Sequence, residues 1–171
     1  MKDTLSIINQ MQAKGVIDRY AIAGAVGATF YLEPAATFDI DILVVLPSVP
    51  GSSLLSLSPI YDYLKARGCR VEREHIMVGN WPVQFLPAGD DLEKHALAEA
   101  VLTQVEGVST WVLSAEYLVA LALRTGRLKD HTRILEFLER RAVDRQRLQD
   151  ILSHHGLLSA WEGFERKYVG D

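Results

Sequence analysis

The sequence predicts an α+β fold, with a small mixed β-sheet flanked by helices and followed by a C-terminal helical bundle. Up to about residue 113, short apolar and β-branched runs alternate with helical patterns, whereas residues 114–171 show helical periodicity only. The chain has 171 residues, of which 49% are hydrophobic and 23% charged, which suits a folded domain with its own core. We therefore divide it into an α/β core, 1–113, and a helical part, 114–171, packed on that core as one unit.

Helical and strand periods alternate through the first part. Its first helix is indicated by Leu5, Ile8 and Met11, which lie on one helical face. A later helix is indicated by Ser58 as the cap and Pro59 as the first helical residue. In chain order, the sequence predicts a helix over 3–14, a short strand or helix-lead segment over 20–23, a helix over 25–32, a strand over 38–46 and a loop over 47–58. It then predicts a helix over 59–67, strands over 70–78 and 81–87, a helix over 90–98, and a hairpin over 101–106 and 108–113.

The second part is predicted to contain four helices. Ser114 is the expected cap of the first of these. Their predicted ranges are 115–125, 129–141, 144–155 and 158–168.

Composition excludes several functional classes. A net charge of -4 argues against indiscriminate nucleic-acid binding. The single cysteine, Cys69, excludes an intramolecular disulfide and a cysteine zinc cluster, and we interpret it as an unreactive thiol. The N-terminal residues lack the pattern of a secretion signal, and no apolar run reaches the roughly 18 residues of a membrane span. The expected location is the cytoplasm, without membrane attachment.

Asp39 and Asp41 are the most informative pair in the chain. They begin an apolar run predicted to be a strand, so their side chains project from one face, with Cα atoms roughly 6–7 Å apart. Like charges on a sheet need compensation, and Mg²⁺ is typically held by one or two carboxylates together with substrate phosphates. The alternative is a solvated pair on an edge strand, or a pair bridged to nearby basic residues.

Gly24 and Ala25 form a second candidate site ahead of the aspartates. They lie between a predicted strand and a predicted helix. A small residue at such a turn lets a triphosphate approach the backbone, and the helix N-terminus favours phosphate charge. A tight turn with close helix packing at Gly24 and Gly27 is the alternative interpretation.

Four segments in this order resemble one known superfamily. They are AGAVGA at 23–28, FDIDI at 38–42, PVQFL at 82–86 and LALRTGRLKD at 121–130. The sequence resembles the polymerase-beta-like nucleotidyltransferases, and within them the small bacterial AbiEii-type enzymes, which include toxins of toxin–antitoxin pairs. The resemblance implies a mixed sheet followed by a helical bundle, and transfer of a nucleoside monophosphate from an NTP to a hydroxyl with loss of pyrophosphate.

The resemblance also implies roles for individual residues. Asp39 and Asp41 would be catalytic and would hold Mg²⁺ or Mn²⁺. The implied nucleotide-binding residues are Gly24, Ala25, Thr37, Arg124, Arg127 and Lys129. The implied partners are an NTP, an acceptor that is RNA, a protein or a small molecule, a cognate antitoxin, and a second copy of the chain in a homodimer.

The sequence departs from the superfamily pattern at three positions. Gln84 stands where a third carboxylate is expected, and a glutamine carries no charge and cannot act as a general base. Glu72 and Glu74 are candidates to replace it. No arginine precedes Thr37, and Arg124 stands at a position of lysine. A degenerate nucleotidyltransferase that binds a nucleotide or a protein without turnover is therefore an alternative function, and a purely structural protein is a third.

Other charged residues have simpler interpretations. Arg124, Arg127 and Lys129 also suit a solvated helix end, and Asp130 suits an N-cap or an ion-pair partner. His154 and His155 are adjacent on a predicted helix, where neighbours diverge by about 100°, so we expect them to decorate its C-terminus. The remaining histidines show no ligand spacing, and no histidine metal site is predicted.

Overall fold

The computed structural model describes residues 1–34, 37, 39–48, 50–51 and 55–170. Phe38, where the second strand was predicted to begin, lies outside the described residues. In the predicted loop 47–58, residues 49 and 52–54 also lie outside the described residues. The same holds for residues 35–36 ahead of Thr37 and for residue 171 at the end of the helical part.

The described strands form one mixed sheet with the order β3-β4-β5-β2-β1-β7-β6. β2 pairs in parallel with β5, and β1 with β7, while the other neighbours are antiparallel. The strands are β1 (Arg19–Ile22), β2 (Ile40–Val45), β3 (Arg70–Glu72), β4 (His75–Val78), β5 (Trp81–Pro87), β6 (Val101–Val105) and β7 (Val108–Val112). This confirms the predicted mixed sheet.

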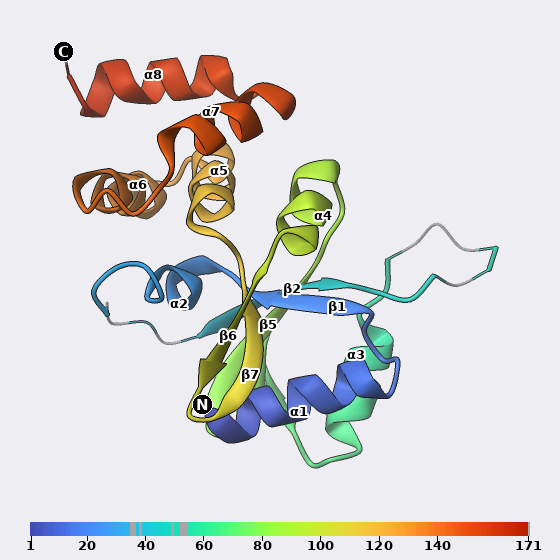
Figure 1. Cartoon of the computed structure of the whole chain (residues 1–171). Helices are drawn as coiled ribbons and strands as arrows, with labels where there is room; N and C mark the ends of the chain where they lie inside the picture. The colour runs from blue at the N-terminus through green and yellow to red at the C-terminus, as the bar shows by residue number, and fades with distance from the viewer. Residues whose placement is uncertain (35–36, 38, 49, 52–54, 171) are drawn as a thin grey trace.

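Helices cover both faces of the sheet. α1 and α3 lie against one face, α2 and α4 lie on the other side, and α5 to α8 stack beyond them (Figure 1). The helices are α1 (Lys2–Ala13), α2 (Gly24–Ala28), α3 (Ser58–Lys65), α4 (Asp91–Ala98), α5 (Ala115–Thr125), α6 (Leu128–Glu139), α7 (Arg145–His154) and α8 (Leu158–Tyr168). Within the described residues, none of these helices combines the length and the apolar character needed to span a membrane.

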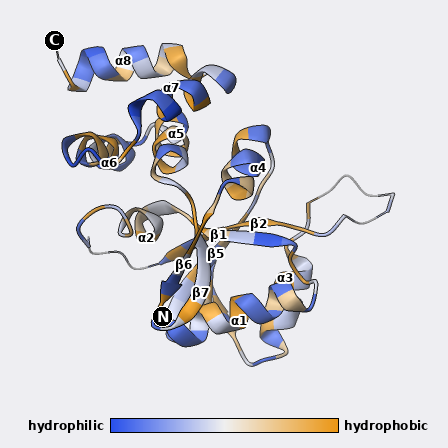
Figure 2. Ribbon diagram, in the orientation of Figure 1, coloured by the Kyte–Doolittle hydropathy of each residue, from blue (hydrophilic) through white to orange (hydrophobic). Residues whose placement is uncertain are grey.

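The alternation along β2 divides the core in two and positions the aspartates. Ile40, Ile42 and Val44 are buried in a cluster with residues of α1 and α3. Leu43 projects to the other face and belongs to a cluster that extends through α4 and α5 to α8. Asp41 shares the face of Leu43, because side chains two residues apart on a strand point the same way. Figure 2 shows apolar colouring along β2 and on α5, whereas α6, α7 and α8 carry both polar and apolar residues.

The pairing of β1 with β7 brings the two halves of the chain together. Ile22 is in register with Val112, and the backbone N–H of Leu113 donates to the carbonyl of Ile22 at 3.0 Å. Gly24 follows β1, and Ser114, whose hydroxyl accepts from Tyr117 as the predicted cap of α5, follows β7. The turn that opens α2 therefore lies close to the start of α5.

Three local predictions were wrong. The strand predicted over 70–78 is two strands, because Arg73 adopts a left-handed conformation (φ 58°) and reverses the chain between β3 and β4. The helix predicted over 25–32 is only α2, and the chain continues in turns after Thr29, whose hydroxyl donates to the carbonyl of Val26 at 2.7 Å. Ser58 is the first residue of α3 and Leu57 is its N-cap.

Candidate functional site

Asp41 lies against the turn at Gly24. Gly24 has φ +58°, and a β-carbon built there would overlap Oδ2 of Asp41 and lie 2.9 Å from its Cγ. The backbone N–H of Ala23 donates to the carbonyl of Asp41 at 2.8 Å, which fixes the turn to β2. Only glycine leaves room for the carboxylate here while adopting this backbone conformation. Gly24 and Asp41, both predicted as site residues, are thus in contact.

Cations on α6 face the aspartate pair. The pKa of Asp41 is raised, mainly because the carboxyl is buried and secondly because of the negative charge of Asp39. The positive charges of Lys129, Arg127 and Arg133 act in the opposite direction and lower the pKa. The two carboxylates and three basic side chains therefore share one electrostatic environment, although the sheet and α6 are far apart in the sequence.

Asp39 makes a contact that the sequence did not predict. Its Oδ2 lies 3.0 Å from Nε2 of His75, at the start of β4. The hydroxyl of Thr37 donates to the backbone carbonyl of Asp39 at 3.3 Å, so Thr37 helps to shape the entry to β2. Asp39 and His75 are both partly buried. The His75 imidazole thus holds one oxygen of Asp39, and among the described residues no side-chain hydrogen bond or ion pair engages the other.

Gln84 occupies the predicted third position in the sheet. It is in register with Asp41 on the parallel neighbour β5, so the two side chains share a face. Glu72 cannot take its place, because β3 is three strands from β2, or roughly 14 Å at about 4.8 Å per strand. Glu74 lies exposed in the turn after β3. In the described part of the chain, no third carboxylate gathers with Asp39 and Asp41 at a spacing suited to metal sharing.

A cavity of about 280 Å³ opens between the sheet and the C-terminal helices. Its polar lining includes Asp41, Glu93, Asp130 and several arginines, and its apolar lining comes from β2, β5 and α5. The residues that form the wall are Ala23, Gly24, Asp41, Leu43, Leu86, Pro87, Glu93, Leu118, Leu121, Ala122, Arg124, Thr125, Arg127, Asp130 and Arg133.

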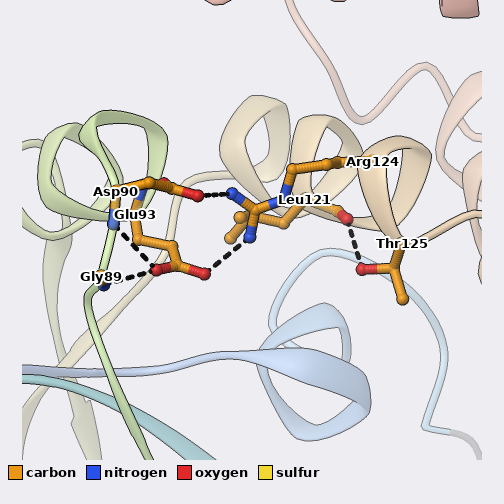
Figure 3. Close-up of polar contacts among 6 residues, drawn as sticks. All are labelled: Gly89, Asp90, Glu93, Leu121, Arg124 and Thr125. Carbon is orange, nitrogen blue, oxygen red and sulfur yellow. Dashed lines mark hydrogen bonds and ion pairs between the residues drawn. The ribbon is translucent and has the colours of Figure 1, made fainter.

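Arg124 lines this cavity but is held by acidic partners. Its guanidinium makes a close ion pair with Asp90 and a second, at 2.6 Å, with Oε1 of Glu93 (Figure 3). The other oxygen of Glu93 accepts from the backbone N–H of Gly89 at 2.7 Å, and Asp90 and Glu93 together cap α4. Arg124 therefore links α5 to the start of α4, and its charge is largely compensated.

Asp130 organises the basic end of α6. Only 2% of its side chain is exposed, and it accepts from Nε of Arg127 at 2.7 Å and lies 3.6 Å from Nη1 of Arg133. It therefore acts as an ion-pair partner, as we expected from the sequence. The Arg127 side chain remains 58% exposed, and Lys129 is exposed as well, so both cations are accessible at the rim of the site.

The structure brings together most of the predicted residues. Asp41, Gly24, Arg124 and Arg127 line one cavity, with Asp39, Gln84 and Lys129 beside it. The lining formed by the described residues does not include Ala25, which follows Gly24 in α2.

Besides Asp90 and Glu93, two residues near the aspartate pair were not found from the sequence. Arg133 lies one helical turn after Lys129, and this spacing was an available signal. His75 carries no local signal, because only the register of β4 against β5 places it near the aspartates.

The donor atoms of the aspartate pair fit a hard divalent cation. Two carboxylates on one face, one of them pressed against a glycine turn, supply the oxygen ligands that Mg²⁺ prefers. The amide oxygen of Gln84 is a neutral oxygen ligand on the same face. The remaining positions around Mg²⁺ are commonly filled by water and substrate phosphates.

Comparison with known proteins identifies the fold. No protein-family model matches the chain, and no curated protein sequence matches it. Two solved structures resemble it over nearly their full length: an antigenic nucleotidyltransferase-like protein from Paracoccidioides brasiliensis (TM-score 0.55, 15% identity, 94% of this chain and 93% of that chain) and the antibiotic-resistance factor ANT(2'')-Ia (TM-score 0.51, 15% identity, 97% of this chain and 100% of that chain).

At this level of identity the similarity establishes the fold, which is that of the nucleotidyltransferases. The fold expected from the sequence resemblance is thus confirmed.

Proposed function

We propose that this protein is a nucleotidyltransferase, which transfers a nucleoside monophosphate from Mg-NTP to a hydroxyl acceptor. The observation that carries the proposal is the contact between the Asp41 carboxylate and Gly24, opposite the basic end of α6 across the cavity. A nucleoside triphosphate is a polyanion that arrives with a divalent cation. It therefore matches a site with carboxylates on one wall and cations on the other.

The chain's own residues have separate tasks in binding. Gly24 leaves room for the Asp41 carboxylate, which places this carboxylate beside the backbone turn that would receive the triphosphate. Lys129 and Arg127 are exposed at the rim and are suited to pair with phosphate oxygens, while Arg133 adds positive charge deeper in the site. Asp39 and Asp41 would hold Mg²⁺, or Mn²⁺, which neutralises the charge that develops on the transferred phosphoryl group.

The reaction requires a base, and Gln84 cannot supply it. The acceptor oxygen forms a bond to the α-phosphorus, the bond to pyrophosphate breaks, and the acceptor proton must be received. His75 is the imidazole on this face of the sheet. A neutral imidazole that donates its Nε2–H to Asp39 leaves the Nδ1 lone pair free to accept a proton. We assign this role to His75.

The more specific expectations rest on the sequence resemblance. They are an AbiEii-type activity, an acceptor that is RNA, a protein or a small molecule, a cognate antitoxin, a homodimer and a cytoplasmic location. We retain them as hypotheses, because acceptor recognition depends on surfaces that the fold alone does not define.

Transfer of label from an α-labelled NTP is the direct test. Each of the four NTPs is incubated with the protein, Mg²⁺ and an acceptor panel of total tRNA, protein extract and small hydroxyl compounds. Asp39→Asn and Asp41→Asn are each expected to abolish transfer, whereas Asp62→Asn, an exposed change of the same kind on α3, is expected to retain it. Transfer that survives in the double variant Asp39→Asn with Asp41→Asn contradicts the proposal.

The catalytically degenerate alternative has its own supporting observations. Gln84 stands next to Asp41 in place of a carboxylate, and Arg124 is engaged by Asp90 and Glu93. This alternative predicts that Mg-NTP raises the melting temperature while no acceptor becomes labelled. Labelling of any acceptor in the panel, dependent on Asp41, excludes it.

A further inference from the structure

Three histidines from different parts of the chain meet on the surface. His95 is on α4, His154 is the last residue of α7, and His155 is its C-cap. One nitrogen of each ring lies within 4.8 Å of the others, and this is the one such group of three His, Cys, Asp or Glu side chains among the residues that the structure describes. The ring centroids are 4.8–5.4 Å apart.

This arrangement corrects the expectation that His154 and His155 diverge. His155 is the C-cap of α7, where its backbone N–H still donates to the carbonyl of Ile151 at 3.1 Å, and Gly156 follows in the left-handed conformation (φ 68°). The two side chains nevertheless turn toward each other, and their rings meet edge to face at 4.8 Å. His95 then completes the group from a helix that is 60 residues earlier in the sequence than His155.

We propose that His95, His154 and His155 bind a divalent transition-metal ion of the zinc class. Imidazole nitrogen suits Zn²⁺, Ni²⁺ and Cu²⁺, whereas Mg²⁺ prefers oxygen. Two nitrogens bound at about 2.0–2.1 Å in tetrahedral geometry are roughly 3.3 Å apart. Nδ1 of His95 and Nε2 of His155 are separated by 3.3 Å. The nitrogen pair therefore already has the spacing that a shared zinc ion requires.

The surroundings of the histidines also favour a cation. The three rings open into a hollow of about 450 Å³ whose charged lining also includes Glu99, Asp150 and Arg147. Two of the three histidines are exposed, so an ion can enter from solvent and retain a water ligand. Glu99 is engaged by Tyr117 and Arg147, at 2.9 and 2.7 Å, and one oxygen of Asp150 accepts from Gln146 at 3.0 Å. The imidazoles and the second oxygen of Asp150 are therefore the available ligands among the residues that line this hollow.

A bound ion would join the α/β core to the helical part. α4 belongs to the core and carries Asp90 and Glu93, which hold Arg124 of α5 (Figure 3). α7 belongs to the C-terminal helices and packs on α5. A zinc ion between α4 and α7 would thus add a second connection between the core and the helical part. Both connections start from α4, which also holds Arg124. This role is independent of the proposed nucleotide reaction.

The test uses the full chain, treated with a chelator and then titrated with ZnCl₂ in millimolar Mg²⁺. Equilibrium dialysis is expected to give one zinc ion per chain. Saturating zinc is expected to raise the melting temperature by about 5–10 °C at a hundredfold excess over Kd. His95→Gln, His154→Gln and His155→Gln are each expected to weaken zinc binding by at least about tenfold. His131→Gln, on α6, is the matched control and is expected to bind zinc normally.

Other outcomes overturn the proposal. If the imidazoles form only a direct hydrogen bond between α4 and α7, zinc will leave the melting temperature unchanged. If zinc binds instead at the aspartate pair, the shift will persist in all three histidine variants and disappear in Asp39→Asn with Asp41→Asn. Co²⁺ absorption provides a second readout, since a tetrahedral nitrogen site gives intense visible bands that each of the three histidine variants is expected to lose.

Discussion

The carboxylate of Asp41 occupies the space that a side chain at position 24 would need. A β-carbon on Gly24 would lie 2.9 Å from Cγ of Asp41, so the turn and the strand are matched to each other. The first residue of α2 and the second of β2 thus form one unit, and a change in either position acts on the other.

Gly24→Ala is expected to destabilise the protein and to remove nucleotide binding. The left-handed backbone costs about 1–2 kcal/mol for a non-glycine residue, and the overlap with Asp41 adds to this. Urea unfolding and the Mg-NTP shift in melting temperature measure the two effects. Gly15→Ala is the matched control, because Gly15 has φ +71° and a β-carbon built there would meet no atom within 4 Å. This variant is expected to lose only the stability that the left-handed backbone costs, and Mg-NTP should still raise its melting temperature.

Asp41→Asn is expected to raise the free energy of unfolding at about pH 7 while abolishing transfer. Burial and the charge of Asp39 raise the pKa of Asp41, so the ionised carboxylate destabilises the folded state at pH values above that raised pKa. This penalty disappears as the pH falls through the raised pKa to the ordinary value of an aspartate. The free energy of unfolding that Asp41→Asn gains over the unchanged protein, measured by urea unfolding, should therefore be smaller at about pH 4. A loss of stability at neutral pH contradicts this account.

Arg124→Gln is expected to affect stability more than nucleotide affinity. The guanidinium joins Asp90 and Glu93 rather than facing a free phosphate site, and its loss should lower the free energy of unfolding by about 1 kcal/mol. A double-mutant cycle with Glu93→Gln measures the coupling. Arg140→Gln breaks an exposed pair with Glu33 and should change stability by less than about 0.5 kcal/mol. If Arg124→Gln reduces the free energy of Mg-NTP binding by more than it reduces the free energy of unfolding, the result supports the phosphate role predicted for Arg124.

Lys129→Gln and Arg133→Gln are each expected to weaken Mg-NTP binding by about tenfold or more. A charge-assisted hydrogen bond contributes about 1.5–3 kcal/mol, and both cations already act on Asp41. Calorimetry with a non-hydrolysable NTP gives the Kd values. Lys65→Gln, in the last turn of α3 on the opposite face of the sheet, is the control and should bind normally. Equal losses in all three variants would indicate a nonspecific effect of net charge.

His75→Gln is expected to lower kcat by about 100-fold or more and to leave the Kd of Mg-NTP nearly unchanged. The glutamine amide can still donate to Asp39, but it cannot accept a proton. Added imidazole should restore part of the turnover, because it replaces the missing base. If His75 only orients Asp39, His75→Gln will keep its turnover and imidazole will have no effect.

Sequence reasoning was most successful where the interactions are local. The apolar alternation of β2 and the cap at Ser114 are short-range patterns, and both are present in the structure. It could not find partners that lie far away in the chain. The phosphate role predicted for Arg124 did not take account of Asp90 and Glu93, which are 34 and 31 positions earlier and on another helix, and this role stays a prediction.

The left-handed residue Arg73 shows a different limit. Arg73 reverses the chain between β3 and β4, which the sequence pattern presents as one strand. Arginine has no preference for the left-handed conformation that would predict this reversal. The role of the candidate site residues remains a prediction, because the fold places them without showing what they bind.

The junction of Ile22 with Val112 has a kinetic consequence. Closing a contact between two such distant points costs loop entropy that local contacts do not, so we expect it to form in the late steps of folding. Gly24 and the start of α5 are brought together by this contact. A partly folded intermediate in which β7 has not yet docked would carry Asp41 on a formed strand, with Asp39 just ahead of it, but would lack the opposing wall. The capacity to bind a polyanion should therefore be acquired in the last kinetic phase of refolding.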